Sequence, residues 1–255
     1  MKFFVLCKKK VLFALLTVIA LALSLITVGQ TGAYAVYAGK TTRKLPIYCV
    51  QTEEKKVALS FDAAWGADKT EKILDILTDY DVKATFFVCE FWAEKYPDML
   101  KKLHDSGRVE VGTHSSTHPH MNSLSKSQVE LELTSSVNAI ESIIGSKPTL
   151  FRPPFGEYNN TLLETAESLG LYTVQWDVDS LDWKGVKSEK MASRILNKAK
   201  EGSIVLMHND GEHTVEALPA IIEGLINKGY TLVTIGDLIY KENYTIDNTG
   251  KQIHE

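Results

Sequence analysis

Residues 109–120 read VEVGTHSSTHPH, a short apolar run followed directly by three histidines. Val109 to Gly112 has the composition and length of a buried β-strand. His114 and His118 are four residues apart, so one helical turn or a tight loop directs both imidazoles at one point, as a divalent metal requires. By itself, this spacing is equally typical of two surface or core histidines.

The same unit of a β-rich run and a polar end recurs along the chain. Between most runs lie stretches with apolar residues at three-and-four spacing, several of them followed by a glycine, as at helix ends. This alternation predicts an α/β fold: a parallel sheet covered by helices, closed or nearly closed into a distorted (β/α) barrel of about seven strands. The predicted strands are Val57 to Phe61, Ala84 to Val88, Val109 to Gly112, Thr149 to Phe151, Tyr172 to Gln175, Ile204 to Met207 and Thr231 to Thr234.

Unusual polar residues follow five of these strands. In a β/α barrel, the carboxyl ends of the strands meet at one rim, where the chemistry collects. The sequence therefore predicts that five side chains share a rim, namely Asp62, His114, Arg152, Asp179 and His208.

The composition sets limits on the class of protein. With 255 residues, 44% apolar and 24% charged, the chain can bury one large core. The formal net charge is −4, and the leader holds four lysines and no acid, so the rest of the chain carries 24 basic and 32 acidic residues. This acidic balance argues against nucleic acid as a partner. Cys49 and Cys89 could pair in an oxidising compartment, but two cysteines make no disulfide framework.

The N-terminus has the pattern of an export segment. Lysines at positions 2, 8, 9 and 10 precede a hydrophobic helix, the uncharged apolar run from Val11 to Val28. Ala33 and Ala35 offer a cleavage site, so a cleaved signal peptide and a membrane anchor inserted through residues 11–28 both remain open. We expect a leader over 1–36, a linker over 37–54, an exported catalytic domain over 55–240 and a loose polar tail over 241–255.

Two groups of residues indicate acid/base chemistry. Asp62 leaves an apolar strand and is either a helix cap or a general base, and Arg152 has a planar cation that can keep it ionised. Asp177, Asp179 and Asp182 lie close together in sequence, and one of them near His208 would hold its tautomer and make it a proton donor.

Five segments together resemble a known family. SFDAAW, THSSTH, RPPFG, DSLDW and IVLMH, in this order, are similar to the motifs of the NodB-like polysaccharide deacetylases, carbohydrate esterase family 4. The resemblance covers about residues 55–239. The sequence around the motifs looks most like that of the membrane-anchored, sporulation-associated deacetylases of Gram-positive bacteria.

The resemblance implies metal-dependent hydrolysis of N-acetyl groups from amino sugars of peptidoglycan or a chitin-like glycan. It implies that a divalent metal, Zn²⁺ or Co²⁺, is held by His114 and His118. It also implies the following roles: Asp62 is the base, Arg152 orients it, the backbone N–H of Phe155 helps to bind the oxyanion, Asp179 tunes the general acid His208, and Trp183 and Leu206 line the pocket for the acetyl methyl group.

One position departs from the family. The residue after the base is normally a second aspartate that binds the metal, and here it is Ala63. Either Asp62 moves onto the metal, or a group such as Asp68 or His120 replaces the ligand, or the protein works poorly as a hydrolase. His120 lies two positions beyond His118, which on a helical turn would not face the pair.

The leading hypothesis is an exported deacetylase of N-acetylated cell-wall glycan. The competing hypothesis is a degenerate deacetylase retained as a glycan-binding or wall-assembly protein, because Ala63 cannot bind a cation. A third alternative keeps the fold and hydrolyses a different amide, such as a small cyclic one.

Overall fold

The computed structural model describes residues 15–19 and 43–255. Leu15 to Ile19 are helical, and the rest of the expected leader lies outside the described residues. Among the helices of the described residues, none is both long enough and apolar enough to cross a bilayer.

Residues 44–255 form one compact unit in which strands and helices alternate. Its strands are β1 (Cys49–Val50), β2 (Lys56–Ala63), β3 (Ala84–Val88), β4 (Val109–Thr113), β5 (Leu150–Phe151), β6 (Tyr172–Thr173), β7 (Val178–Asp179), β8 (Ile204–His208), β9 (Thr231–Val233), β10 (Tyr244–Ile246) and β11 (Lys251–His254). Its helices are α3 (Thr70–Asp79), α4 (Glu90–Lys95), α5 (Pro97–Asp105), α6 (Lys126–Ile144), α7 (Asn160–Ser168), α8 (Ser188–Lys198), α9 (Thr214–Asn227) and α10 (Ile235–Leu238), with short 3₁₀ turns η1 (Met121–Ser123), η2 (Pro154–Gly156) and η3 (Asp182–Lys184).

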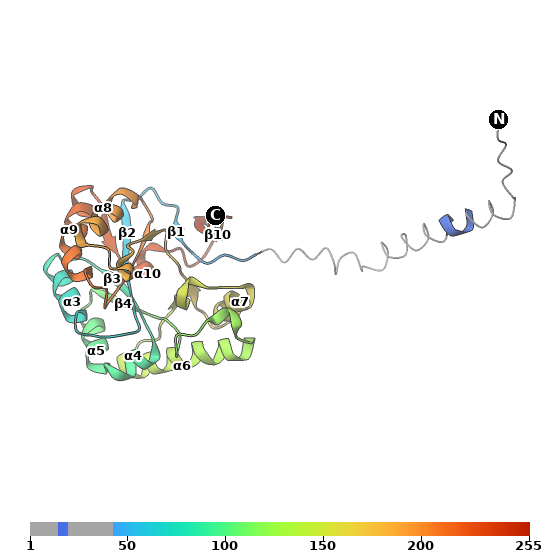
Figure 1. Cartoon of the computed structure of the whole chain (residues 1–255), viewed down its shortest axis with the longest axis horizontal. Helices are drawn as coiled ribbons and strands as arrows, with labels where there is room; N and C mark the ends of the chain where they lie inside the picture. Colours follow the sequence, from blue (N-terminus) through green and yellow to red (C-terminus); the bar gives the residue numbers. More distant parts are fainter. Residues whose placement is uncertain (1–14, 20–42) are drawn as a thin grey trace, which may run out of the picture. The chain divides into compact units, whose positions relative to one another are not determined.

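The central sheet is parallel and confirms the predicted barrel class. Its hydrogen-bonded order is β6-β5-β4-β3-β2-β8-β7, and β9 pairs with the beginning of β2. All seven predicted strands are present, and β7 is an additional short strand. The sheet curls into a half-barrel whose path ends at β6 and β7, and the helices lie around its outer side (Figure 1).

Strand β2 shows why the sheet has an apolar outer face and a polar inner end. Successive side chains of a strand point to opposite faces. Val57, Leu59, Phe61 and Ala63 pack with the helices in the main core cluster, while Asp62 lies on the opposite face. Burial of this outer face between sheet and helices supplies the main hydrophobic stabilisation of the domain.

The C-terminal residues are ordered, so the expectation of a loose tail over 241–255 is wrong. β11 pairs with β10 in an antiparallel manner and with β1 in a parallel manner, which joins the tail to the described part of the expected linker. The side chain of Gln252 is fully buried and exchanges hydrogen bonds with the backbone of Tyr240. A polar segment can therefore be ordered here because its polar groups are paired within the domain.

The two cysteines of the described chain are free and buried. Cys49 lies on β1, whereas Cys89 follows β3 and directs its thiol at the backbone oxygen of His114, 3.4 Å away. Burial raises the pKa of the Cys49 thiol to about 11. Both cysteines are therefore structural, and the pairing that the sequence left open is absent from this structure.

Candidate active site

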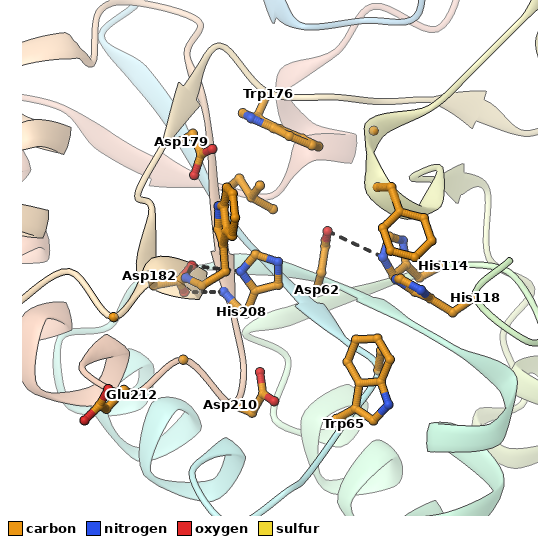
Figure 2. A pocket seen from close by; sticks show the side chains of 17 residues that line it. Asp62, Trp65, His114, His118, Trp176, Asp179, Asp182, His208, Asp210 and Glu212 are labelled. Carbon is orange, nitrogen blue, oxygen red and sulfur yellow. Dashed lines mark hydrogen bonds and ion pairs between the residues drawn. The ribbon is translucent and has the colours of Figure 1, made fainter. Parts of the chain in front are cut away.

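A pocket of about 620 Å³ opens at the carboxyl ends of the parallel strands. Figure 2 shows Asp62 in its centre, with His208 on one side and His114 and His118 on the other. These residues come from β2, from β8 and from the loop after β4, and parallel strands bring their carboxyl ends to the same edge. Of the five residues of the predicted rim, Asp62, His114, Asp179 and His208 line this pocket.

The central carboxylate is held in its ionised form by a buried arginine. Nη1 of Arg152 donates to Oδ1 of Asp62 at 2.9 Å, and Nη2 donates to the backbone oxygen of Gln175 at 3.1 Å. The guanidinium is fully buried and lies 4.2 Å from the centre of the Phe87 ring. Burial alone would raise the pKa of Asp62, but Arg152 and nearby histidines outweigh it, so the net pKa is lowered. Asp62 is therefore ionised.

The two histidines of the second motif, THSSTH, lie next to each other. Nδ1 of His114 lies 2.7 Å from the backbone oxygen of Arg152, and a carbonyl can only accept, so Nδ1 carries the proton. Nε2 of neutral His114 then has a free lone pair, 3.6 Å from Oδ2 of Asp62. The ring centres of His114 and His118 are 4.9 Å apart. Burial, and then the neighbouring His114, lower the pKa of His118 to about 4, so both imidazoles are neutral near pH 7.

The loop that carries His118 is strained and is held by an acid from α6. Ser115 and His118 both have positive φ angles, which is uncommon for residues with side chains. Oε2 of Glu132 accepts hydrogen bonds from the backbone N–H groups of Ser116 and Thr117 at 3.0 and 2.8 Å, and Oε1 accepts from the Thr117 hydroxyl. Sequence reasoning missed Glu132, because its partners are backbone groups that no motif identifies.

The acidic partner of His208 is Asp182, which corrects the expected pairing with Asp179. Nδ1 of His208 donates to Oδ1 of Asp182 at 2.8 Å, and the backbone N–H of His208 donates to Oδ2 at 2.6 Å. Asp179 instead accepts from the backbone N–H of Leu181, which caps the turn that leads to η3. The three acids are close in sequence, and only the turn between β7 and η3 determines which of them faces the imidazole.

Asp182 is buried and saturated with donors. Its oxygens also accept from the hydroxyl of Thr214 and the backbone N–H of Trp183, and a Cβ at Gly211 would lie 2.7 Å from Oδ2, so only glycine fits there. Burial lowers the pKa of His208, but the hydrogen bond and charge of Asp182 outweigh burial and raise it. His208 is therefore poised as a proton donor with a fixed tautomer.

The expected substrate-binding side chains all line the pocket. Phe155, with a positive φ of 58°, lies between His118 and His120, while Trp183 and Leu206 lie on the side of His208. The pocket also has lining residues that sequence reasoning did not assign to it (Figure 2). Among them are Trp65, Trp176, Asp210 and Glu212.

The donor set does not fit a resident zinc with three protein ligands. Ala63 is fully buried and is not among the residues that line the pocket, whereas the next residue, Ala64, is. Neither Asp68 nor His120, the suggested replacements for the third metal ligand, lines the pocket. Asp68 is exposed, and the ring of His120 stacks on Phe155 while its Nδ1 contacts Glu157. In the part of the chain that is described, no three His, Cys, Asp or Glu side chains are arranged to hold a metal.

Comparison with known proteins agrees with this architecture. Residues 50–174 match the family model of polysaccharide deacetylases. The chain is 35% identical over 194 residues to the uncharacterized protein YlxY of Bacillus subtilis, which covers 76% of the chain and 60% of YlxY. It is 33% identical over 199 residues to the peptidoglycan-N-acetylmuramic acid deacetylase PdaA of B. subtilis, which covers 76% of the chain and 75% of PdaA.

A similar solved structure is BA3943 of Bacillus anthracis, a CE4 family pseudoenzyme. It is 32% identical with a TM-score of 0.74, and the match covers 82% of this chain and 73% of that one. A BA3943 mutant with restored enzymatic activity is 36% identical, with the same TM-score of 0.74, over 77% of this chain and 71% of that one.

The fold is a curled parallel half-barrel, and its carboxyl edge carries an ionised carboxylate and a histidine paired with an aspartate. Together they define a hydrolase-type fold of the NodB class. The chain belongs to the polysaccharide deacetylase family, carbohydrate esterase family 4. Because the chain spans 60% of YlxY, this relative includes regions that have no counterpart here.

Proposed function

We propose that the protein hydrolyses the N-acetyl amide of amino sugars in a cell-wall glycan, on the outer side of the membrane. One observation carries this proposal: Asp62 and His208 face one pocket, Asp62 paired with a buried guanidinium and His208 with a buried carboxylate. The pKa of Asp62 is lowered, so it is an ionised base, and that of His208 is raised, so it is an acid.

In this mechanism, Asp62 accepts a proton from the water that attacks the acetyl carbonyl. Arg152 keeps the base ionised, and the backbone N–H of Phe155 is the proposed donor to the oxyanion. The acetyl methyl group contacts Leu206 and Trp183. His208 then donates the proton on Nε2 to the departing amine, while Asp182 holds Nδ1 and stabilises the imidazolium.

A divalent metal, Zn²⁺ or Co²⁺, would bind His114 and His118, and when bound it would act as a Lewis acid on the carbonyl. The two imidazoles are neutral, as ligands must be, but a third separate ligand is missing at Ala63. We therefore assign no step to a metal, and metal dependence is a separate arm of the test.

The test is acetate release from N-acetylglucosamine oligomers and from peptidoglycan, with EDTA, with added Zn²⁺ and with added Co²⁺. We expect release in at least one metal arm, and His208→Ala should abolish it. His104→Ala, a histidine on α5 outside the pocket, is the matched control and should retain activity. No acetate from any glycan under any condition would refute the proposed hydrolysis.

A second candidate function, glycan binding without turnover, is favoured by the missing ligand at Ala63 and by the similarity to the BA3943 pseudoenzyme. It predicts that glycan oligomers bind to the protein by calorimetry while no acetate appears in any metal arm. Retention of the whole acid/base set speaks for the hydrolase, since binding alone requires no Asp–His pair.

We also propose export through residues 11–28, as a signal peptide or an anchor. The support is the basic flank and the apolar run in the sequence, most of which lies outside the described residues. Fractionation of cells that produce the full chain or a version without residues 1–36 tests this. Recovery of the full chain in the cytoplasm would contradict it.

A further inference from the structure

The central carboxylate has one oxygen without a hydrogen-bond donor. Oδ1 of Asp62 accepts from Arg152, but Oδ2 accepts no hydrogen bond within the described part of the chain, and its near neighbour is Nε2 of His114 at 3.6 Å. Because Nδ1 of His114 carries the proton, Nε2 is also an acceptor. Asp62 is only 6% exposed, and both residues line the pocket, so two acceptors face each other where one donor in the pocket can contact both.

Water can donate to both atoms, and a cation or a strong N–H donor adds a direct attraction to the charge of Asp62. A catalytic metal would fill this place, but it requires a third protein ligand, which the described residues do not provide. A protonated primary amine has three N–H donors and no fixed coordination geometry. It can donate to Oδ2 of Asp62 and to Nε2 of His114 at once, and such charge-assisted hydrogen bonds are the strong ones.

The charge of the pocket wall favours the same occupant. Besides Asp62 and Asp182, which are paired with cations, three further carboxylates line the pocket, and no lysine or arginine is among the lining residues. Two lysines lie near the wall: Nζ of Lys184 lies over the outer part of the wall at Trp183, 4.5 Å from a ring centre, and Nζ of Lys69 is bound by three backbone oxygens of residues 210–212. The three further carboxylates are Asp179, Asp210 and Glu212 (Figure 2).

The pocket also offers flat apolar surfaces for sugar rings. Trp65 and Trp183 line it from different loops, and they are 58% and 57% exposed, so their indole faces are accessible to a ligand. Large exposed aromatic side chains in a concave site are typical of ligand contact rather than of the core. An amino-sugar ring can therefore rest on an indole while its amine reaches Asp62.

We propose that the pocket selects the free-amine form of the glycan, with the protonated 2-amino group of a de-N-acetylated sugar bound between Oδ2 of Asp62 and Nε2 of His114. The inference rests on the proposed function only for the class of ligand, an amino-sugar glycan. It adds that the deacetylated form binds more tightly than the acetylated form, and that no metal is required.

The experiment compares two trisaccharides of equal length, glucosamine trimer and N-acetylglucosamine trimer, by calorimetry with the full chain in EDTA. We expect the amine form to bind about tenfold more tightly, because it adds charge-assisted hydrogen bonds in a buried place. Asp62→Asn should remove this preference. Circular dichroism checks its folding, because Arg152 loses its partner in this variant.

Rim variants keep the test decisive if Asp62→Asn does not fold. Asp210→Asn and Glu212→Gln, both exposed, should each weaken binding of the amine trimer about two- to fivefold and leave the acetylated trimer unchanged. Asp98→Asn, an exposed acid on α5 outside the pocket, is the matched control and should change neither.

Equal or tighter binding of the acetylated trimer in EDTA overturns the inference, as does a preference that survives in folded Asp62→Asn. A preference that appears only after metal is added also overturns it. Acetate release is measured in a separate experiment. Its absence contradicts the proposed function, whereas the ratio of the affinities for the two trimers decides this inference.

Discussion

The imidazole of His208 is bound twice by one carboxylate. Asp182 accepts the side-chain Nδ1–H at 2.8 Å through one oxygen and the backbone N–H at 2.6 Å through the other. The pair therefore fixes both the tautomer of the ring and the position of the end of β8. The same carboxylate explains why the pKa of His208 is raised in a partly buried place that would otherwise lower it.

Replacing Asp182 should convert His208 from an acid into a neutral histidine. In Asp182→Asn, no negative charge remains to outweigh the effect of burial, so the pKa of His208 should fall below its ordinary value. Any acetate release should then fall by about 100-fold or more, because the proton donor is lost. NMR titration of the imidazole measures the pKa. Asp179→Asn is the matched control, and a fall of the pKa in that variant instead would show that the observed pairing is wrong.

The pair also predicts how stability depends on pH. The pKa of His208 is raised in the folded protein. Its contribution to the free energy of unfolding is therefore complete below the unfolded-state pKa of 6.5 and is lost as pH rises through the folded-state pKa. Burial tends to raise the pKa of Asp182, but the hydrogen bond and charge of His208 outweigh burial, so the net pKa is lowered. The contribution of Asp182 to the free energy of unfolding is therefore present above its ordinary pKa of 3.8 and is lost as pH falls. Urea unfolding of wild type and Asp182→Asn should therefore differ most between about pH 4 and 6.5. A difference that does not depend on pH would contradict this assignment.

Removing the buried guanidinium should destabilise the fold itself. Arg152→Met leaves the Asp62 carboxylate buried without its partner, which should lower the free energy of unfolding by about 3–5 kcal/mol. Arg108→Met, which breaks a pair with exposed Asp81, should cost less than about 1 kcal/mol. Adding Asp62→Asn to Arg152→Met should recover part of the loss, and no recovery would mean that the cost has another origin.

The clamp by Glu132 should order the histidine loop. Glu132→Ala removes the acceptor for Ser116 and Thr117, which should cost about 1–3 kcal/mol locally, because two backbone donors lose their partner. Hydrogen exchange of these two amides should accelerate while the amides of β4 stay protected. Glu130→Ala on the exposed face of the same helix is the control. Unchanged exchange in Glu132→Ala would show that the loop holds its shape without the clamp.

Adding the absent carboxylate should create a metal site. Zn²⁺ should bind at least tenfold more tightly to Ala63→Asp than to wild type, as measured by calorimetry, because β2 ends at position 63 and a carboxylate there can turn towards His114 and His118 as a third donor. Without metal the variant should be less stable than wild type, because position 63 is fully buried, and Zn²⁺ should restore the loss. Equal Zn²⁺ affinities would contradict the expected ligand position, and His118→Ala in the variant should abolish the gain.

The sequence by itself determined the architecture and most of the site. The apolar runs and their spacing predicted the seven strands, because burial of alternate faces depends on local periodicity. It also predicted that Asp62, Arg152 and His208 share a rim, because the ends of parallel strands meet at one edge.

Only the tertiary structure decided which neighbours pair. The backbone turn before η3 selects Asp182 over Asp179 for His208, and Ala63 is buried at the end of β2 without lining the pocket. Glu132 reaches backbone groups fifteen and sixteen residues away, and the polar tail is ordered by pairing with β1. These contacts depend on distances between segments far apart in sequence, and local propensity contains no information about them.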